Sequence, residues 1–258
     1  MSYRHYLVFL FIIILGHSKV IAADRWGEYL KNDLDQIKRN INISTVLYTG
    51  GWLTGMYFLS NYDDPLNRSV KDLYSGKWKY YFNTVDHLGN GLYTGPISIG
   101  IAGLSLLGSD KKFQDAAFTS AESFVLTATI TTMTKFILGR SRPSANAGPR
   151  CFAPFSDVRS SFPSGHASTA FALLTPWIVY YPSPYTYFLL VFPAGTAIAR
   201  MVFNRHWFTD VLTGSVLGFL IGYNLAKWHK NLANQNTYYS NERVSYYSIS
   251  VNIPIGGL

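Results

Sequence analysis

Cysteine and charge are both scarce in this chain. Cys151 is the one cysteine among 258 residues, which excludes an intrachain disulfide and a zinc site built from several cysteines. Charged residues make up 14% of the chain and hydrophobic residues 48%, whereas a typical soluble domain has about 25% charged residues. This balance indicates a single helical domain at or near a membrane, or a tightly packed exported domain.

Acidic residues are nearly absent from one long segment. Asp157 is the only acid between Lys135 and Arg205, in a chain whose formal net charge is +8. This excess of positive charge predicts an anionic partner. The sequence contains no Lys/Arg run and no nucleic-acid-binding motif, so nucleic acid is not the expected partner.

The N-terminal residues have the layout of a secretory signal. Arg4 precedes an apolar stretch over residues 6–16, and small residues around Ala22 provide a cleavage site. The apolar stretch is about eleven residues long, whereas a membrane span needs about twenty. We therefore expect residues 1–22 to be a signal peptide, with a retained helical anchor as the alternative. Either one directs the chain to export.

Apolar periodicity and turn signals predict an all-α protein built as a single bundle of about six core helices. An amphipathic helix is expected over residues 23–40, and loop with some helix over residues 63–81. The helical domain would span residues 23–230, and in the tail over residues 231–258 a stretch at 244–251 alternates like a strand. The predicted apolar helices cover residues 42–62, 88–108, 113–138, 164–180, 185–203 and 207–228.

Two topologies are open for this bundle. Six membrane spans after an exported N-terminus would place the ends of the third and fifth helices in the cytoplasm, whereas a bundle that does not cross leaves them outside. The mean hydropathy of only +0.08 and the hydroxyl-rich segment Thr127–Thr134 favour a periplasmic-type bundle. We expect it to associate with a membrane and its site to face away from the cytoplasm.

The first of three polar clusters lies at the end of a predicted helix. Lys135 and Arg142 are seven residues apart, which is two helical turns, so their side chains share a face, and Pro143 marks the helix end. The same two cations could simply complement the helix dipole. Arg140 and Arg150 could hold a second phosphate or a head group, but the sequence favours solvated loop positions for both.

The second cluster, Pro163-Ser164-Gly165-His166, begins a long apolar helix. Proline and serine are good residues for a helix start, so the segment could be a cap and nothing more. Gly165, however, lets a ligand approach the backbone, and free N–H groups at a helix start bind anions.

In the third cluster, Arg200 precedes His206 by six residues and Asp210 follows it by four. The i,i+4 spacing lets the carboxylate hold one ring nitrogen and fix the tautomer, although such a pair is often only structural.

Read together, Lys-x6-Arg-Pro, Pro-Ser-Gly-His and Arg-x5-His-x3-Asp resemble the signature of the type 2 phosphatidic acid phosphatase and vanadium haloperoxidase superfamily, in its lipid phosphatase and bacterial acid phosphatase branch. The resemblance covers Lys135 to Asp210. Ala199 stands where the family commonly has serine, which removes one hydroxyl contact but no charge.

This resemblance implies a role for each cluster. His206 would attack phosphorus, Asp210 would orient it, and His166 would protonate the leaving group and then activate water. Because three side-chain cations can replace a metal, no metal or other cofactor is expected. The phosphoryl oxygens would be held by Lys135, Arg142 and Arg200, with the backbone at Ser164 and Gly165.

The expected function is a phosphatase for a lipid phosphate, such as phosphatidate or a polyprenyl diphosphate, or for a small soluble phosphate ester. The runner-up is a vanadate-dependent haloperoxidase, because the same cations could hold vanadate. A non-catalytic envelope protein that keeps the bundle is the alternative from another class, and the intact histidines argue against it. The sequence leaves the natural substrate and the oligomeric state open.

Overall fold

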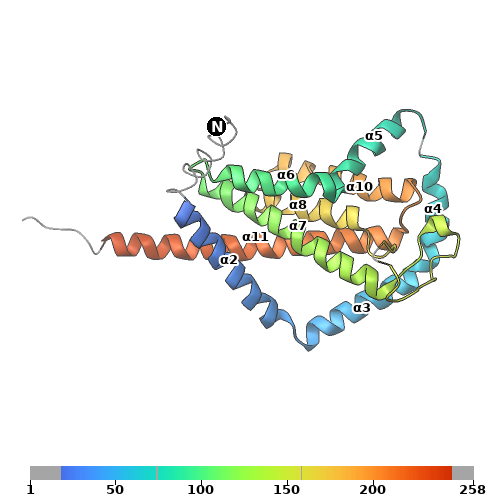
Figure 1. The fold of residues 1–258 in the computed structure, drawn as a ribbon, viewed down its shortest axis with the longest axis horizontal. Coiled ribbons are helices and arrows are strands. Elements are labelled where there is room, and N and C mark those ends of the chain that lie inside the picture. The colour runs from blue at the N-terminus through green and yellow to red at the C-terminus, as the bar shows by residue number, and fades with distance from the viewer. Residues whose placement is uncertain (1–18, 74, 158, 246–258) are drawn as a thin grey trace, which may run out of the picture.

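The computed structural model describes residues 19–73, 75–157 and 159–245, and over these residues the regular elements are helices (Figure 1). This confirms the predicted all-α bundle. The helices are α2 (Lys19–Asn40), α3 (Ile43–Leu59), α4 (Asp63–Lys71), α5 (Gly76–Asp86), α6 (Gly91–Ser105), α7 (Lys111–Leu138), α8 (Gly165–Tyr180), α9 (Pro184–Phe188), α10 (Val191–Val202) and α11 (Phe208–Ser245). Three short 3-10 helices join them: η1 (Ser60–Tyr62), η2 (His87–Gly89) and η3 (Pro143–Ala145).

The centre of the bundle is formed by α7, α8 and α11, which pack against one another. Helix α6 packs on α7, α10 packs on α5 and α8, and α2 crosses α11 (Figure 1). The start of α8, the end of α7 and the start of α11 are therefore brought to one end of the core. These are the three places where the sequence has its polar clusters.

Glycines allow α8 and α11 to approach closely. Gly214 and Gly218 lie one turn apart on α11, and a methyl group at either would collide with the carbonyl of Ser164 or Ser168 on α8. Gly222 continues the same row against the next turn of α8. Since only glycine fits such a close backbone approach, this row fixes the distance between the two helices.

The segment 63–81, predicted as loop with some helix, is mostly helical, because it holds α4 and half of α5. In α4, Asp63 and Asp64 lie in the first turn and Arg68 and Lys71 in the last, so the charges complement the helix dipole at both ends. Pro65 is tolerated because it lies in the first turn, where its missing N–H is not needed.

Other predicted boundaries are met in part. The helix predicted from residue 113 is found as α7, which begins after Asp110, whose side chain accepts a hydrogen bond from the Phe113 amide at 3.1 Å. The predicted helix 185–203 is divided into α9 and α10, and α11 continues to Ser245, well past residue 228. The rest of the predicted strand and most of the predicted signal peptide lie outside the described residues.

Apolar side chains are abundant on the surface. On the first turns of α3, Ile43, Val46, Leu47 and Tyr48 are between 60% and 79% exposed. By length and composition, two stretches of the described residues could cross a membrane, Pro184–Val202 and Phe208–Gln235.

Candidate active site

Lys135 lies in the last turn of α7, and its ammonium group is buried. The Nζ atom donates hydrogen bonds to the carbonyls of Ser160 at 2.5 Å and Ser161 at 3.2 Å. Gly139 ends the helix in the left-handed region, with φ +59°, and so turns the chain away just after Lys135. The pKa of Lys135 is lowered to about 7, chiefly by burial; Asp210 opposes the shift, and the nearby cations Arg142 and Arg200 contribute to it.

The second cluster forms the start of α8. The Ser164 side chain caps the helix by accepting from the Ala167 amide at 3.5 Å, which confirms the predicted cap. The Ser164 amide donates to the Asp210 carbonyl at 2.9 Å, so it is not directed at a phosphate as the resemblance implied. Gly165 is the first residue of the helix, where N–H groups have no carbonyl partner within the helix. A methyl group at Gly165 would lie 3.9 Å from Cε of Lys135, so the first two clusters adjoin.

His206 lies in the turn between α10 and α11 and is only 2% exposed. Its Nδ1 atom is 3.5 Å from Oδ2 of Asp210, which confirms that the i,i+4 spacing brings the two side chains together. Burial lowers the pKa of His206 to about 3. The imidazole is therefore neutral over the physiological range, and one of its ring nitrogens keeps a lone pair.

Asp210 is fully buried and held at both oxygens. Its Oδ2 atom accepts from the Trp207 amide at 2.8 Å and from the Ser161 hydroxyl, and its Oδ1 atom accepts from Arg140. A carboxylate with this many donors is fixed in place and remains ionised. The Ser161 hydroxyl was not among the residues that the sequence singled out.

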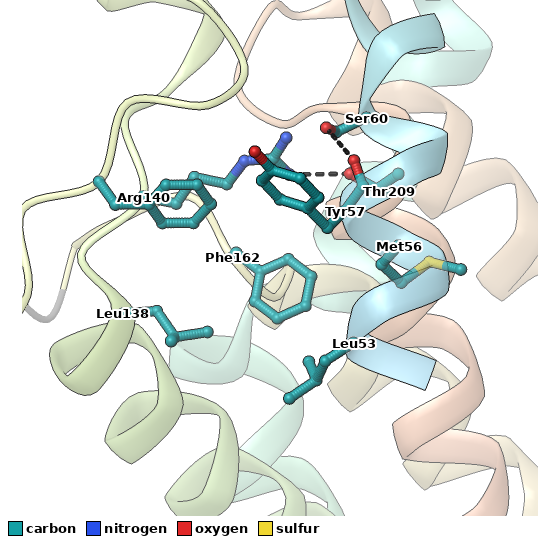
Figure 2. A pocket seen from close by; sticks show the side chains of 9 residues that line it. Leu53, Met56, Tyr57, Ser60, Leu138, Arg140, Phe162 and Thr209 are labelled. Atoms are coloured by element: carbon teal, nitrogen blue, oxygen red, sulfur yellow. Dashed lines mark hydrogen bonds between the residues drawn. The ribbon is translucent and has the colours of Figure 1, made fainter. Parts of the chain in front are cut away.

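Arg140 is not a solvated loop residue, so the favoured sequence interpretation of this position is wrong. The side chain is 2% exposed and binds Asp210 with one terminal nitrogen and Asp63, at 2.6 Å, with the other. Figure 2 shows the guanidinium group reaching Thr209, to which it donates at 2.8 Å. Thr209 in turn donates its amide to Oδ1 and its hydroxyl to Oδ2 of Asp63, at 2.9 and 2.7 Å.

A small apolar cavity lies beside this network (Figure 2). Its volume is about 170 Å³, and its walls include Leu53 and Met56 of α3, Leu138 of α7 and Phe162. Low polarity on this side strengthens the ion pairs of Arg140, because few polar groups compete for them. By contrast, Arg150 is exposed as predicted, and its guanidinium lies 4.6 Å from the centre of the Tyr57 ring.

Arg200 is buried at the end of α10 and is held by Asp86, the last residue of α5. One terminal nitrogen donates to both Asp86 oxygens at 2.9 Å, while the Nε atom is buried without a hydrogen-bond partner. Sequence reasoning missed Asp86 because it lies 114 residues before Arg200 and belongs to no motif. As a single acid outside any motif, it gives no signal of function in the sequence.

His166 is the second residue of α8 and faces the same group of charges. Burial lowers its pKa to about 4, with Arg200 as the next cause, and Asp86 opposes the shift. Gly89 of η2 lies directly against it, because a methyl group there would be 2.5 Å from the His166 carbonyl oxygen. Asp86 and Gly89 thus belong to one segment that borders both Arg200 and His166.

Arg142 is half-buried in the loop after α7 and donates from Nε to the Arg159 carbonyl at 2.9 Å. Its pKa is lowered by burial and then by the neighbouring cations Arg200 and Arg205. Arg142, Lys135 and Arg200 therefore lie close enough to repel one another. Such a group of converging cations, with two neutral imidazoles beside it, can bind a tetrahedral dianion and transfer a phosphoryl group to nitrogen.

Within the described part of the chain, the side chains grouped closely enough to hold a metal ion are Asp33, Glu122 and His229. They belong to α2, α7 and α11, and none of them belongs to the three clusters.

One family model and two curated proteins match part of this chain. The PAP2 superfamily profile matches residues 116–233, which include all three clusters. The chain is 30% identical over 137 residues to the lipid A 1-phosphatase of Porphyromonas gingivalis, covering 52% of this chain and 28% of that protein. It is 32% identical over 127 residues to a PA-phosphatase related-family protein of Dictyostelium discoideum, covering 43% of this chain and 47% of that protein. The chain thus matches between about a quarter and a half of the length of these relatives.

Among solved structures, the chain is similar to the crystal structure of Aquifex aeolicus LpxE. The TM-score is 0.46 at 18% sequence identity, and the match covers 64% of this chain and 94% of that one.

Proposed function

We propose that this chain, in which residues 116–233 form a PAP2 superfamily domain, is a metal-independent phosphatase that acts on a phosphorylated lipid. One observation carries the proposal. A buried, neutral His206 lies beside the fixed carboxylate of Asp210. Next to this pair lie three cations, and their positive charge exceeds the negative charge of the carboxylates that bind them.

In the first step, Nε2 of His206 attacks phosphorus while the bond to the leaving oxygen breaks, which gives a phosphohistidine. Nδ1 keeps its proton and directs it to Asp210, which stabilises the positive charge that develops on the ring. Lys135, Arg142 and Arg200 hold the phosphoryl oxygens, and this positioning supplies most of the rate enhancement in phosphoryl transfer.

His166 would donate the proton that the leaving alkoxide needs. Its lowered pKa means that it is neutral before a phosphate binds. A phosphate dianion beside the ring favours the charged form and raises the pKa again, so that substrate binding itself loads the acid. In the second step, the neutral His166 takes a proton from water as the water oxygen attacks phosphorus, the N–P bond breaks and orthophosphate is released.

Two of the cations have donors to offer the phosphate. The Nε atom of Arg200 is buried without a partner while its terminal nitrogen is held by Asp86, so the side chain is oriented before substrate binds. Lys135 uses two of its three ammonium donors on the Ser160 and Ser161 carbonyls, which leaves one for a phosphoryl oxygen.

Lipid is the favoured substrate class for three reasons. Both curated relatives have names that denote lipid phosphatases or their relatives, the surface of α3 exposes large apolar side chains, and two segments have the length and composition of membrane spans. We propose that the chain is exported and works at the envelope membrane with its site facing away from the cytoplasm, as the N-terminal sequence favours.

A panel of substrates tests the proposal. We expect release of inorganic phosphate from phosphatidate, a polyprenyl diphosphate or a lipid A that carries a 1-phosphate, and weaker release from p-nitrophenyl phosphate. A chelator should leave the initial rates unchanged. The absence of release from every substrate would overturn the phosphatase, and immediate loss of activity on chelation would overturn the metal-independent mechanism. Halide oxidation after addition of vanadate and peroxide would favour the haloperoxidase instead.

A further inference from the structure

A second buried polar cluster lies where α2 crosses α7 and α11, far from the proposed catalytic residues. His229 of α11 is fully buried, and its Nε2 atom lies 2.7 Å from Oδ2 of Asp33 and 3.5 Å from Oε2 of Glu122. His229 follows Asp210 by nineteen residues on the same helix, which corresponds to about 28 Å at about 1.5 Å per residue. The cluster therefore cannot take part in phosphoryl transfer.

The hydrogen bonds around His229 fix which ring nitrogen carries the lone pair. The Thr119 hydroxyl donates to the Asp115 carbonyl at 2.6 Å, so at its 2.7 Å contact with His229 the Thr119 oxygen must accept. The Nδ1 atom is therefore the N–H donor, and in the neutral ring Nε2 is an acceptor. It faces two carboxylates, which are also acceptors. Three acceptors in contact need a cation or a shared proton between them.

The carboxylates of this cluster are left incomplete. Oδ1 of Asp33 and Oε2 of Glu122 are buried without a hydrogen-bond partner, and the Asp33 side chain is only 4% exposed. Arg25, the basic residue of the neighbouring network, is already paired with Asp115 at 2.8 Å. Two buried acids are thus balanced by one imidazole, and an unpaired buried charge is costly.

We propose that Asp33, Glu122 and His229 form a structural site for a divalent transition-metal ion, with Zn²⁺ as the ion that fits best. One imidazole nitrogen and two carboxylate oxygens are ligands that zinc accepts, and water supplies a fourth in a tetrahedral site. The three ligand atoms lie within 4.8 Å of one another. Tetrahedral ligands about 2.0–2.2 Å from a zinc ion lie about 3.3–3.6 Å apart. The separation of 3.5 Å between Nε2 and the Glu122 oxygen already fits, and the Asp33 oxygen at 2.7 Å would have to move slightly away from Nε2.

The surroundings supply the other features that a metal site needs. The hydrogen bond from Nδ1 to Thr119 orients the imidazole, as second partners of metal-bound histidines generally do. Asp33 and Glu122 also line a mostly apolar groove of about 780 Å³ between α2, α6 and α7, which gives an ion a route to the site. A bound ion would tie α2 to the two long core helices and stabilise the bundle without contacting the substrate.

Metal content and thermal unfolding of the tag-free full-length chain test this site. After equilibration with equimolar Zn²⁺ and desalting, we expect about one zinc per chain by mass spectrometry of the metal. Chelation should lower the melting temperature by about 5 °C or more, and added Zn²⁺ should restore it. Neither readout depends on phosphatase activity, so this proposal and the proposed function can fail separately.

Glu122→Gln distinguishes a metal ion from a shared proton, because the amide has the shape of a protonated carboxyl but is a poor zinc ligand. The metal site predicts that zinc affinity falls about tenfold or more, whereas Asp35→Asn, at an exposed acid on α2, leaves it unchanged. Should Glu122→Gln fail to fold, Thr119→Ala removes only the partner of Nδ1 and should also weaken zinc binding. Equal zinc content in all variants, or a melting temperature that does not change when the chelator is added, would overturn the proposed metal site.

Discussion

Two buried histidines, His206 just before α11 and His229 within it, lie in similar surroundings and differ in how completely the polar groups around them are hydrogen-bonded. Around His206, both oxygens of Asp210 and both oxygens of Asp63 accept hydrogen bonds from Arg140, Thr209, Ser161 or the Trp207 amide. Around His229, one oxygen of Asp33 and one of Glu122 have no hydrogen-bond partner. The first group is complete without a ligand, and the second is not.

This difference shows how buried polar groups can be interpreted. A complete network fixes side chains in advance, which is what a nucleophile needs, because no reorganisation is then required during the reaction. An incomplete network is stable only if something else completes it. At the catalytic end, the unpartnered Nε of Arg200 is the corresponding gap, and we propose that a phosphoryl oxygen of the substrate fills it.

The largest effect is expected from His206→Ala. Loss of the nucleophile should abolish turnover of every substrate, a fall of about 10⁴-fold or more in kcat, because the covalent step no longer exists. Phosphate release measured on the whole substrate panel checks this. Residual turnover within tenfold of the wild type would contradict the assigned nucleophile. His229→Ala, at the buried histidine distant from the proposed catalytic residues, is the matched control, and its folded fraction should retain turnover.

His166→Ala should have an effect that depends on the leaving group. An alkoxide leaving group needs a proton, so kcat for a lipid phosphate should fall about 10²–10⁴-fold. p-Nitrophenolate leaves without one, and the loss should be about tenfold or less. Comparison of kcat for the two substrates checks the acid role, and an equal loss for both would contradict it.

Arg140→Met tests whether the fully hydrogen-bonded network around His206 matters for stability and catalysis. Removal of one partner from a buried charge network should lower the free energy of unfolding by about 3–5 kcal/mol, and kcat should fall with it because Asp210 loses a fixed partner. Arg150→Met, at the exposed arginine of the same loop, should cost less than about 0.5 kcal/mol. Denaturant unfolding and kcat measured on both variants make the comparison, and similar losses would refute the buried role of Arg140.

A smaller, pH-dependent effect is expected from Lys135. Because burial lowers its pKa to about 7, the ammonium charge is present below pH 7 and is lost as the pH rises above it. kcat/KM for p-nitrophenyl phosphate should therefore decrease on the alkaline side of pH 7. Lys135→Arg keeps its charge throughout and should move that decrease to higher pH, whatever its absolute rate. An unchanged alkaline limb in the variant would assign it to another group.

The sequence was sufficient to find the residues that lie in short motifs. Lys135, Arg142, His166, Arg200, His206 and Asp210 were named from spacing and a family resemblance, and the fold brings all of them to one end of the core. Their catalytic roles remain predictions. Helix positions were also predictable wherever apolar periodicity and capping residues agreed, as at Ser164.

Residues that join distant segments could not be found in this way. Asp63 lies 77 residues before Arg140, and Asp86 lies 114 residues before Arg200. Each is an ordinary acid at a helix end, and only tertiary packing turns it into the partner of a buried cation. Arg140 was misjudged for the same reason, since an arginine between a glycine and a serine after a helix is usually exposed.

The glycine row of α11 has a consequence for how this protein can change. Gly214 and Gly218 allow the carbonyls of Ser164 and Ser168 to touch α11, so the start of α8 packs directly on the α11 backbone and has no room for a side chain between them. A larger residue there would act as a wedge and separate the Ser164 amide from the Asp210 carbonyl. Positions that never meet a phosphate would then be as intolerant of substitution as those that do.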